Sequence, residues 1–160
     1  MKKLLVFVLA LTLVLALLGC GSTTDMPEPP LTITSNGESV TPYLHFAYSR
    51  VWEENGFTYA DGVDLAAVLS ELEADGCIPR LTYSHDFAVV LGENVTISHI
   101  LLYDEDFHSL DMLWDIADLS NLDAGNYYIG IVATKDGKCI EEVNETEYVG
   151  WACVVRLHIN

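Results

Sequence analysis

The chain has 160 residues, with 24 acidic and 7 basic side chains, and so a formal net charge of −17. A field of this sign repels the phosphate backbone of nucleic acids, which makes them unsuitable partners. Hydrophobic residues make up 51% of the chain, enough for one packed core, and the length fits a single domain of ordinary size.

Residues 1–20 have the three regions of a secretory signal. Lys2 and Lys3 give the positive start, and the apolar run at 4–18 is 15 residues long, short of the roughly 20 residues of a membrane span. The run LLGC at 17–20 resembles the lipobox of bacterial lipoproteins, in which the cysteine is lipidated and becomes the new N-terminus. The resemblance implies that residues 1–19 are removed, and that lipid on Cys20 anchors the protein to the cell membrane outside the cytoplasm.

Residues 20–30 are predicted to be a tether between the lipid and a folded domain. The run GSTTDMPEPP at 21–30 has no apolar period and contains three prolines. Without residues 1–19, five basic side chains remain against the same 24 acidic ones, so the net charge becomes −19. This charge opposes flat binding to anionic headgroups, and the lipid alone would then hold the protein at the membrane.

Residues 31–160 are predicted to form one β-rich domain. Apolar residues alternate with polar ones in several segments that end at Gly, Asn or Asp turns. The acidic stretch 105–120 has no such period and is predicted to be a loop. The predicted strands lie within 31–34, 43–52, 81–91, 95–103, 127–134 and 151–159.

One segment, residues 63–74, has the period of a helix instead. Its apolar residues recur at helical spacing from Leu65 to Leu72. Asp64 suits the N-cap of such a helix and Gly76 suits its end. We therefore expect one short helix that crosses between strands.

Residues 123–127 (DAGNY) carry the strongest fold signal. They resemble the D-x-G-x-Y run before strand F of immunoglobulin-like domains, where the tyrosine hydroxyl bonds back to the backbone just upstream. Ile129 stands where immunoglobulins have a cysteine, so the usual disulfide between the sheets is not expected. The expected fold is mainly β, an immunoglobulin-like antiparallel β-sandwich with one short helix.

A wider resemblance covers residues 31–160. The stretch is similar to small uncharacterised surface lipoproteins, and to extracellular tails of membrane metallopeptidases related to the β-lactam sensor. The similarity implies a fold but no catalytic or binding residues, and the peptidase motif H-E-x-x-H is missing from the sequence. The strand and turn residues that carry it are 39–43, 81–84, 91–95, 103–104, 124–128 and 148–151.

Three cysteines remain besides Cys20. In an oxidising compartment a disulfide is plausible, and Cys139–Cys153 is the first choice. It would close the acidic segment 140–152 and contribute about 3 kcal/mol in the loop-entropy account. Cys77 would then be free; three reduced thiols are the alternative.

Asp104 and Asp106 follow a predicted strand and are candidates for a weak calcium site. Calcium binds six to eight oxygen ligands, which loop carboxylates can supply. The D-x-D-x-D-G loop is absent, however, so a solvated acidic loop is the alternative reading. We expect no other cofactor.

No motif for nucleophilic catalysis or phosphate binding is present, so an enzyme is not expected. Aromatic side chains near turns suit contact with a protein or a carbohydrate, although they often cap a core. The candidate binding residues are Trp52, Phe57, Tyr59 and Trp151. The sequence thus favours a non-catalytic binding or sensory accessory module of the cell envelope, whose partner is an envelope protein or ligand. A calcium-stabilised structural domain and an envelope hydrolase are the alternatives.

Overall fold

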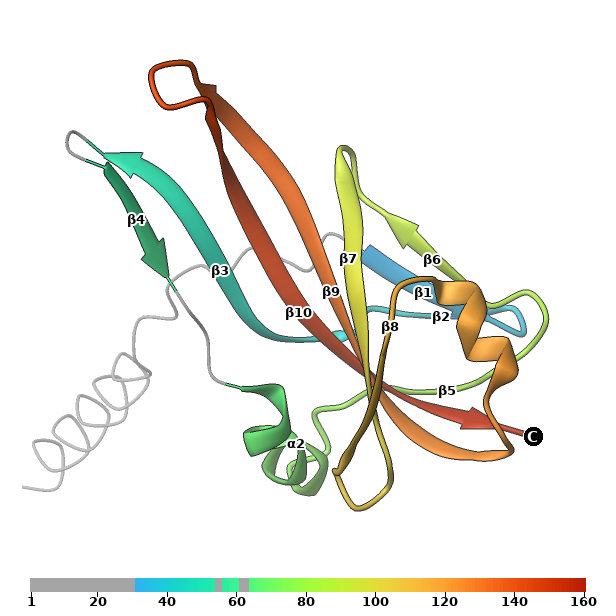
Figure 1. Ribbon diagram of the computed structural model, residues 1–160. Helices are drawn as coiled ribbons and strands as arrows, with labels where there is room; N and C mark the ends of the chain where they lie inside the picture. The colour runs from blue at the N-terminus through green and yellow to red at the C-terminus, as the bar shows by residue number, and fades with distance from the viewer. Residues whose placement is uncertain (1–30, 54–55, 61–63) are drawn as a thin grey trace, which may run out of the picture.

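The computed structural model describes residues 31–53, 56–60 and 64–160. The predicted signal, Cys20 and the predicted tether lie outside them. The described chain is mainly β, with antiparallel sheets, one short α-helix and one 3-10 helix (Figure 1). In chain order the elements are β1 (Leu31–Ser35), β2 (Glu38–Val40), β3 (Tyr43–Glu53), β4 (Gly56–Ala60), α2 (Leu65–Ala74), β5 (Arg80–Thr82), β6 (Ala88–Leu91), β7 (Val95–Tyr103), β8 (Ser109–Leu113), η1 (Ile116–Asn121), β9 (Gly125–Ile140) and β10 (Glu145–Ile159).

The strands form two sheets. The smaller has the order β2-β1-β6, and the larger has the order β4-β3-β10-β9-β7-β8. Strand β10 is central to the larger sheet: it pairs with β9 along its length, with β3 over its first half and with the short parallel strand β5 near its end. All other pairings are antiparallel.

The main hydrophobic core lies between the two sheets. Leu31 and Ile33 of β1 pack with buried residues of β7, β9 and β10. The alternation predicted for residues 151–159 is confirmed, because every second residue is buried in this cluster: Trp151, Cys153, Val155, Leu157 and Ile159. Since side chains alternate across a strand, the intervening residues of β10 face the other side of the sheet.

The helix α2 covers that other side. The Asp64 side chain accepts a hydrogen bond from Ala66 N (3.1 Å), and the left-handed Gly76 (φ 68°) follows the helix, as predicted. Leu65 and Leu69 are buried against the sheet. A Cβ at position 130 would lie 2.6 Å from Leu65 Cδ2, so Gly130 lets the helix approach β9 closely.

Several predicted boundaries are wrong. The segment predicted as one strand at 81–91 contains two, β5 and β6, which belong to different sheets, and the strand predicted from 151 begins at Glu145. The stretch 105–120, predicted as a loop, contains β8 and η1. The strand predicted at 127–134 continues through Asp136 and Gly137 to Ile140, because cross-strand pairing with β10 persists there. Pairing along a long hairpin thus overrides the local turn preference of Asp-Gly.

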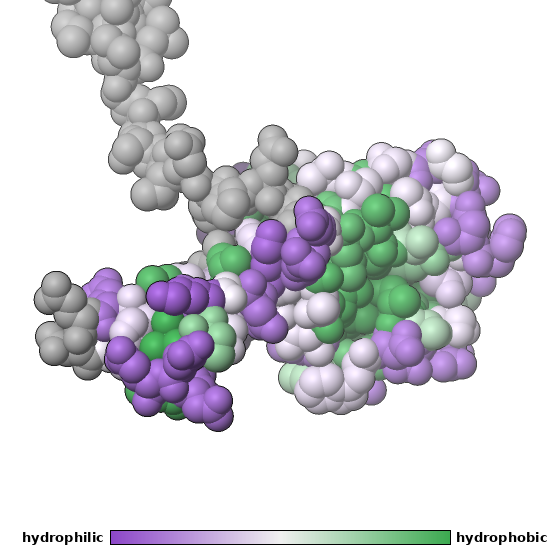
Figure 2. Space-filling model, turned by 90° about the horizontal axis from the view of Figure 1, so that it is seen from above, coloured by the Kyte–Doolittle hydropathy of each residue, from purple (hydrophilic) through white to green (hydrophobic). Residues whose placement is uncertain are grey.

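We call residues 48–53, 56–60 and 134–148 the arm. They comprise the ends of β3, β9 and β10 together with β4, and they extend away from the smaller sheet (Figure 1). Figure 2 shows the arm as a lobe beside the body, with hydrophilic and apolar residues mixed on its surface. The body carries a larger apolar patch on the same view.

Candidate functional site

One face of the arm carries a group of aromatic side chains around an arginine. The register places Trp52 opposite Phe57 and Arg50 opposite Tyr59, while Tyr148 of β10 lies opposite Arg50 on its other side. Directly opposite residues in a sheet share a face. We call this group the aromatic platform; its residues are Tyr48, Arg50, Trp52, Phe57, Tyr59 and Tyr148.

Ring contacts hold the platform together. Trp52 and Phe57 meet edge to face with 5.0 Å between centroids, and the rings of Phe57 and Tyr59 are 6.5 Å apart. Tyr48 and Tyr148 meet edge to face at 5.9 Å. Edge-to-face pairs of this kind stabilise a cluster by about 0.5–1.5 kcal/mol each.

Arg50 links the three strands of the platform. Its guanidinium carbon lies 3.7 Å above the Phe57 ring and 5.7 Å from the Tyr59 ring, and it forms an ion pair with Glu145 of β10. Glu147 accepts a hydrogen bond from the backbone N–H of Trp52 (2.9 Å). Two glutamates of β10 therefore fix the aromatic hairpin β3–β4 against the long hairpin β9–β10.

Gly150 makes room for the inner end of the platform. A Cβ at this position would lie 2.0 Å from Cζ of Tyr48, so any side chain would displace the ring. Burial, and to a smaller extent the neighbouring Tyr148, raise the pKa of Tyr48 above its ordinary value. Its hydroxyl stays protonated at physiological pH and can donate or accept a hydrogen bond.

A hollow of about 380 Å³ adjoins Trp52 at the end of the arm. It lies between Trp52 and residues 138–142, which include Lys138, Cys139 and two glutamates. The platform therefore borders a concave surface that has both signs of charge.

Three of the four predicted binding residues lie together on the platform, and one does not. Trp52 and Phe57 are half-buried and Tyr59 is 57% exposed. Trp151 is only 5% exposed and packs in the core between the sheets, so its prediction as a surface residue is wrong. Its position in β10, one residue after the platform-facing Gly150, turns it to the opposite face.

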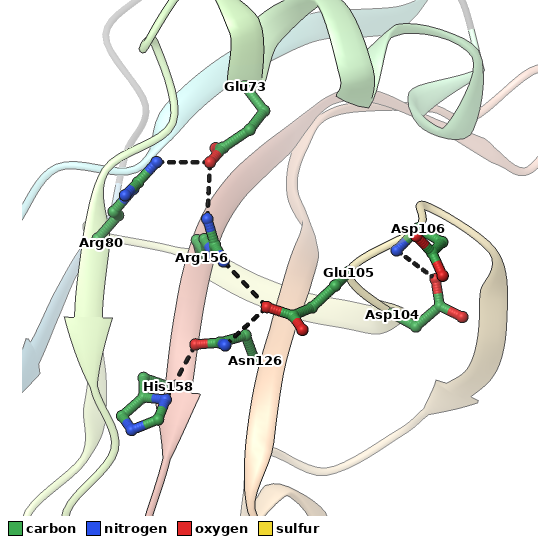
Figure 3. Close-up of polar contacts among 8 residues, drawn as sticks. All are labelled: Glu73, Arg80, Asp104, Glu105, Asp106, Asn126, Arg156 and His158. Carbon is green, nitrogen blue, oxygen red and sulfur yellow. Dashed lines mark hydrogen bonds and ion pairs between the residues drawn. The ribbon is translucent and has the colours of Figure 1, made fainter.

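A second group of polar side chains connects α2 to the end of β10 (Figure 3). Glu73 Oε1 accepts hydrogen bonds from Arg80 (2.5 Å) and Arg156 (2.7 Å). Arg156 also reaches Glu105 (3.1 Å), and Glu105 accepts from the Asn126 amide (2.7 Å), whose oxygen lies 2.9 Å from Nδ1 of His158.

This network borders an open pocket of about 300 Å³. The lining residues are Glu38, Arg80, Leu81, Thr82, Asn126, Arg156 and His158. Both arginines are bound to carboxylates of the protein itself, which offsets their charge. The arrangement fastens α2 and the 104–108 loop to the sheet, and we assign it a structural role.

The predicted calcium ligands, Asp104 and Asp106, lie beside this network in a turn that the Asp104 side chain stabilises. Asp104 Oδ1 accepts hydrogen bonds from the backbone N–H groups of Asp106 (2.9 Å) and His108 (2.8 Å). The hydrogen bond from His108 is the main reason that the pKa of Asp104 is lowered. Among the described residues, no three His, Cys, Asp or Glu side chains are grouped to hold a metal ion. Calcium binding by Asp104 and Asp106 stays a prediction.

The predicted Cys139–Cys153 disulfide is not formed. Cys77, Cys139 and Cys153 are all free, and the register pairs Cys139 with Thr146 but Cys153 with Ile131, far along the same hairpin. The prediction failed because it took residues 140–152 for a loop. In the structure most of this segment belongs to β10, which runs antiparallel to β9. Cys153 is therefore several residues along the hairpin from Cys139.

Only two of these three thiols are expected to react in the folded protein. Cys77 and Cys139 are exposed, whereas burial raises the pKa of the Cys153 thiol to about 12. Since the thiolate is the reactive form, iodoacetamide at pH 8 should label Cys77 and Cys139 but leave Cys153 unmodified until urea unfolds the chain. Peptide mass spectrometry measures this directly; rapid labelling of Cys153 without denaturant would contradict the buried position.

Within the described residues, no helix is both long and apolar enough to cross a membrane. Comparison of the whole chain with protein-family models, curated proteins and solved structures finds no match. The platform and the polar network are therefore interpreted from their own chemistry.

Proposed function

We propose that this chain is a lipid-anchored, non-catalytic binding module of the cell envelope that contacts a protein partner through the aromatic platform. The observation that carries the proposal is the composition of the platform. Trp, Tyr and Arg are the residues most enriched at the energetic centres of protein interfaces, and here five aromatic side chains surround one arginine on a projecting arm.

We further propose that the body is an immunoglobulin-like β-sandwich. The order β8-β7-β9-β10 matches strands C′-C-F-G of a variable-type domain, and β1 and β6 lie in a second sheet as strands A and B do. Tyr127, at the start of β9, donates a hydrogen bond to the carbonyl of Asp123 (3.1 Å), the tyrosine-corner contact expected for strand F. The hairpin β3–β4, added at the edge of β10, then departs from the usual pattern.

The membrane anchor rests on the LLGC run and its flanks. Changing Cys20→Ser removes the thiol that would carry the lipid, so we expect the protein to leave the membrane fraction or to retain its leader. Metabolic labelling with a clickable palmitate and cell fractionation measure the change. A Cys77→Ser variant is the matched control and should behave as the wild type. Lipid label on Cys20→Ser would contradict the proposal.

The binding role predicts that a partner can be captured through the arm. The full chain, tagged at its C-terminus, is cross-linked in intact cells and compared with the Trp52→Ala variant. We expect one protein to be enriched by the wild type and to fall at least about 10-fold with Trp52→Ala, because losing a central aromatic contact costs ~2 kcal/mol. Val90→Ala, which alters an exposed side chain on the smaller sheet, should retain the partner. Equal recovery with both variants would reject the platform as the binding site.

A further inference from the structure

A second surface lies at the opposite edge of the larger sheet from the hairpin β3–β4. Strand β8 ends the order of that sheet, and within the described residues no strand pairs with its outer edge. Leu110 and Met112 of β8 and Trp114 just after it are 50%, 43% and 72% exposed. Large apolar side chains with this exposure are few among the described residues, and three of them fall here at alternate positions. We call them the β8 stripe.

The stripe is continuous with apolar side chains beneath α2. Met112 lies opposite Leu101 of β7, so both are on the α2 side of the sheet. The Trp114 ring contacts the His99 ring, with 6.1 Å between centroids, and this contact orients an otherwise exposed indole. Residues two apart in a strand are spaced by about 7 Å, so Leu110 and Met112 offer two apolar contacts at this spacing to an extended polypeptide, and Trp114 follows just after the strand.

The segment that carries the stripe is acidic. Residues 104–123 contain seven Asp or Glu and no Lys or Arg. Asp111 stands between two stripe residues, and Asp115 follows Trp114. A second copy of this chain would bring the same negative charge to the contact, and anionic lipid headgroups would be repelled as well. Charge complementarity therefore favours a basic partner.

The backbone edge of β8 is partly occupied. The N–H of Met112 donates to the Asp111 carboxylate at 2.7 Å, so the accessible feature is the row of side chains. We infer that the β8 stripe is a docking surface for an extended segment of another protein that alternates apolar with Lys or Arg side chains. Its apolar residues cover the stripe and its cations pair with the acidic rim, in a contact separate from the aromatic platform.

Three synthetic peptides test this inference on the full chain at 150 mM salt. KVKVKVKVKVK has both features, KSKSKSKSKSK keeps only the charge, and EVEVEVEVEVE keeps only the apolar residues. We expect the first to bind at least 10-fold more tightly than either of the others, as measured by fluorescence anisotropy of a labelled peptide. No binding of the first peptide, or equal binding of the first two, would overturn the inference.

Matched variants locate the contact. Changing Leu110, Met112 and Trp114 together to Ser should weaken the first peptide at least 10-fold, whereas changing Val51, Val90 and Val143 to Ser removes three similarly exposed side chains elsewhere and should leave it unchanged. Circular dichroism checks that both variants fold. Weaker binding of the first peptide to the control variant would overturn the inference. So would a wild-type dimer, or binding of the wild type to vesicles, that disappears with the stripe variant, because the stripe would then contact a second copy or lipid.

Discussion

Trp151→Ala is expected to lower the free energy of unfolding by about 3–5 kcal/mol, the usual range when a buried Trp or Phe is truncated. Trp151 is 5% exposed and packs with the central residues of both sheets. It lies opposite Ala133 of β9, a small neighbour that cannot fill the cavity left by the indole. Urea unfolding followed by far-ultraviolet circular dichroism measures the loss.

Two comparisons separate packing from other effects of this change. Trp114→Ala alters an exposed indole and should change stability by about 0.5 kcal/mol or less. Trp151→Phe keeps most of the volume and removes Nε1, which is buried and has no hydrogen-bond partner among the residues that the structure describes. It should therefore cost clearly less than Trp151→Ala. A Trp151→Ala protein as stable as the wild type would mean that this residue is not in the core.

Arg50→Ala is expected to loosen the arm while the body remains intact. The change removes the cation–π contacts with Phe57 and Tyr59 and the ion pair with Glu145. A partly desolvated cation–π contact contributes about 2 kcal/mol, so exchange of the β4 amides should become roughly 30-fold faster. Hydrogen–deuterium exchange of the full chain measures it segment by segment.

Arg50→Lys is the control for charge. Lysine keeps the positive charge near Glu145 but loses the planar guanidinium that lies over the Phe57 ring. We expect faster exchange in β4 with Arg50→Lys as well, but less than with alanine. Amides of β7 and of β9 near Ile131, in the main core, should be unchanged in both variants. Faster exchange throughout the chain would show that Arg50 supports the whole fold rather than the arm.

Much of the fold follows from local patterns. The helical spacing from Leu65 to Leu72 predicts α2, and the alternation from Trp151 to Ile159 predicts the buried face of β10. The run at 123–127 predicts the hydrogen bond of Tyr127 to the Asp123 carbonyl. In each case the signal is contained within about ten residues, and the spacing of the apolar residues agrees with the turn or capping residues beside them.

The site was only partly predictable, because it depends on register between distant strands. Trp52, Phe57 and Tyr59 are close in sequence and form one hairpin, so their grouping could be anticipated. Arg50 was not singled out in the sequence, and Tyr148 joins the hairpin only through the pairing of β10 with β3. Trp151 was assigned to the surface from its residue type, although the alternation of β10 places it on the buried face.

The most direct test of the central claim is photo-cross-linking from the platform in living cells of the native host. A benzoyl-phenylalanine replaces Tyr59, whose ring is exposed at the edge of the platform, or Val90 on the smaller sheet as the matched position. The account predicts a light-dependent adduct with one envelope protein from position 59 and none from position 90. No adduct from position 59, or the same adducts from both positions, would contradict a binding role for the aromatic platform.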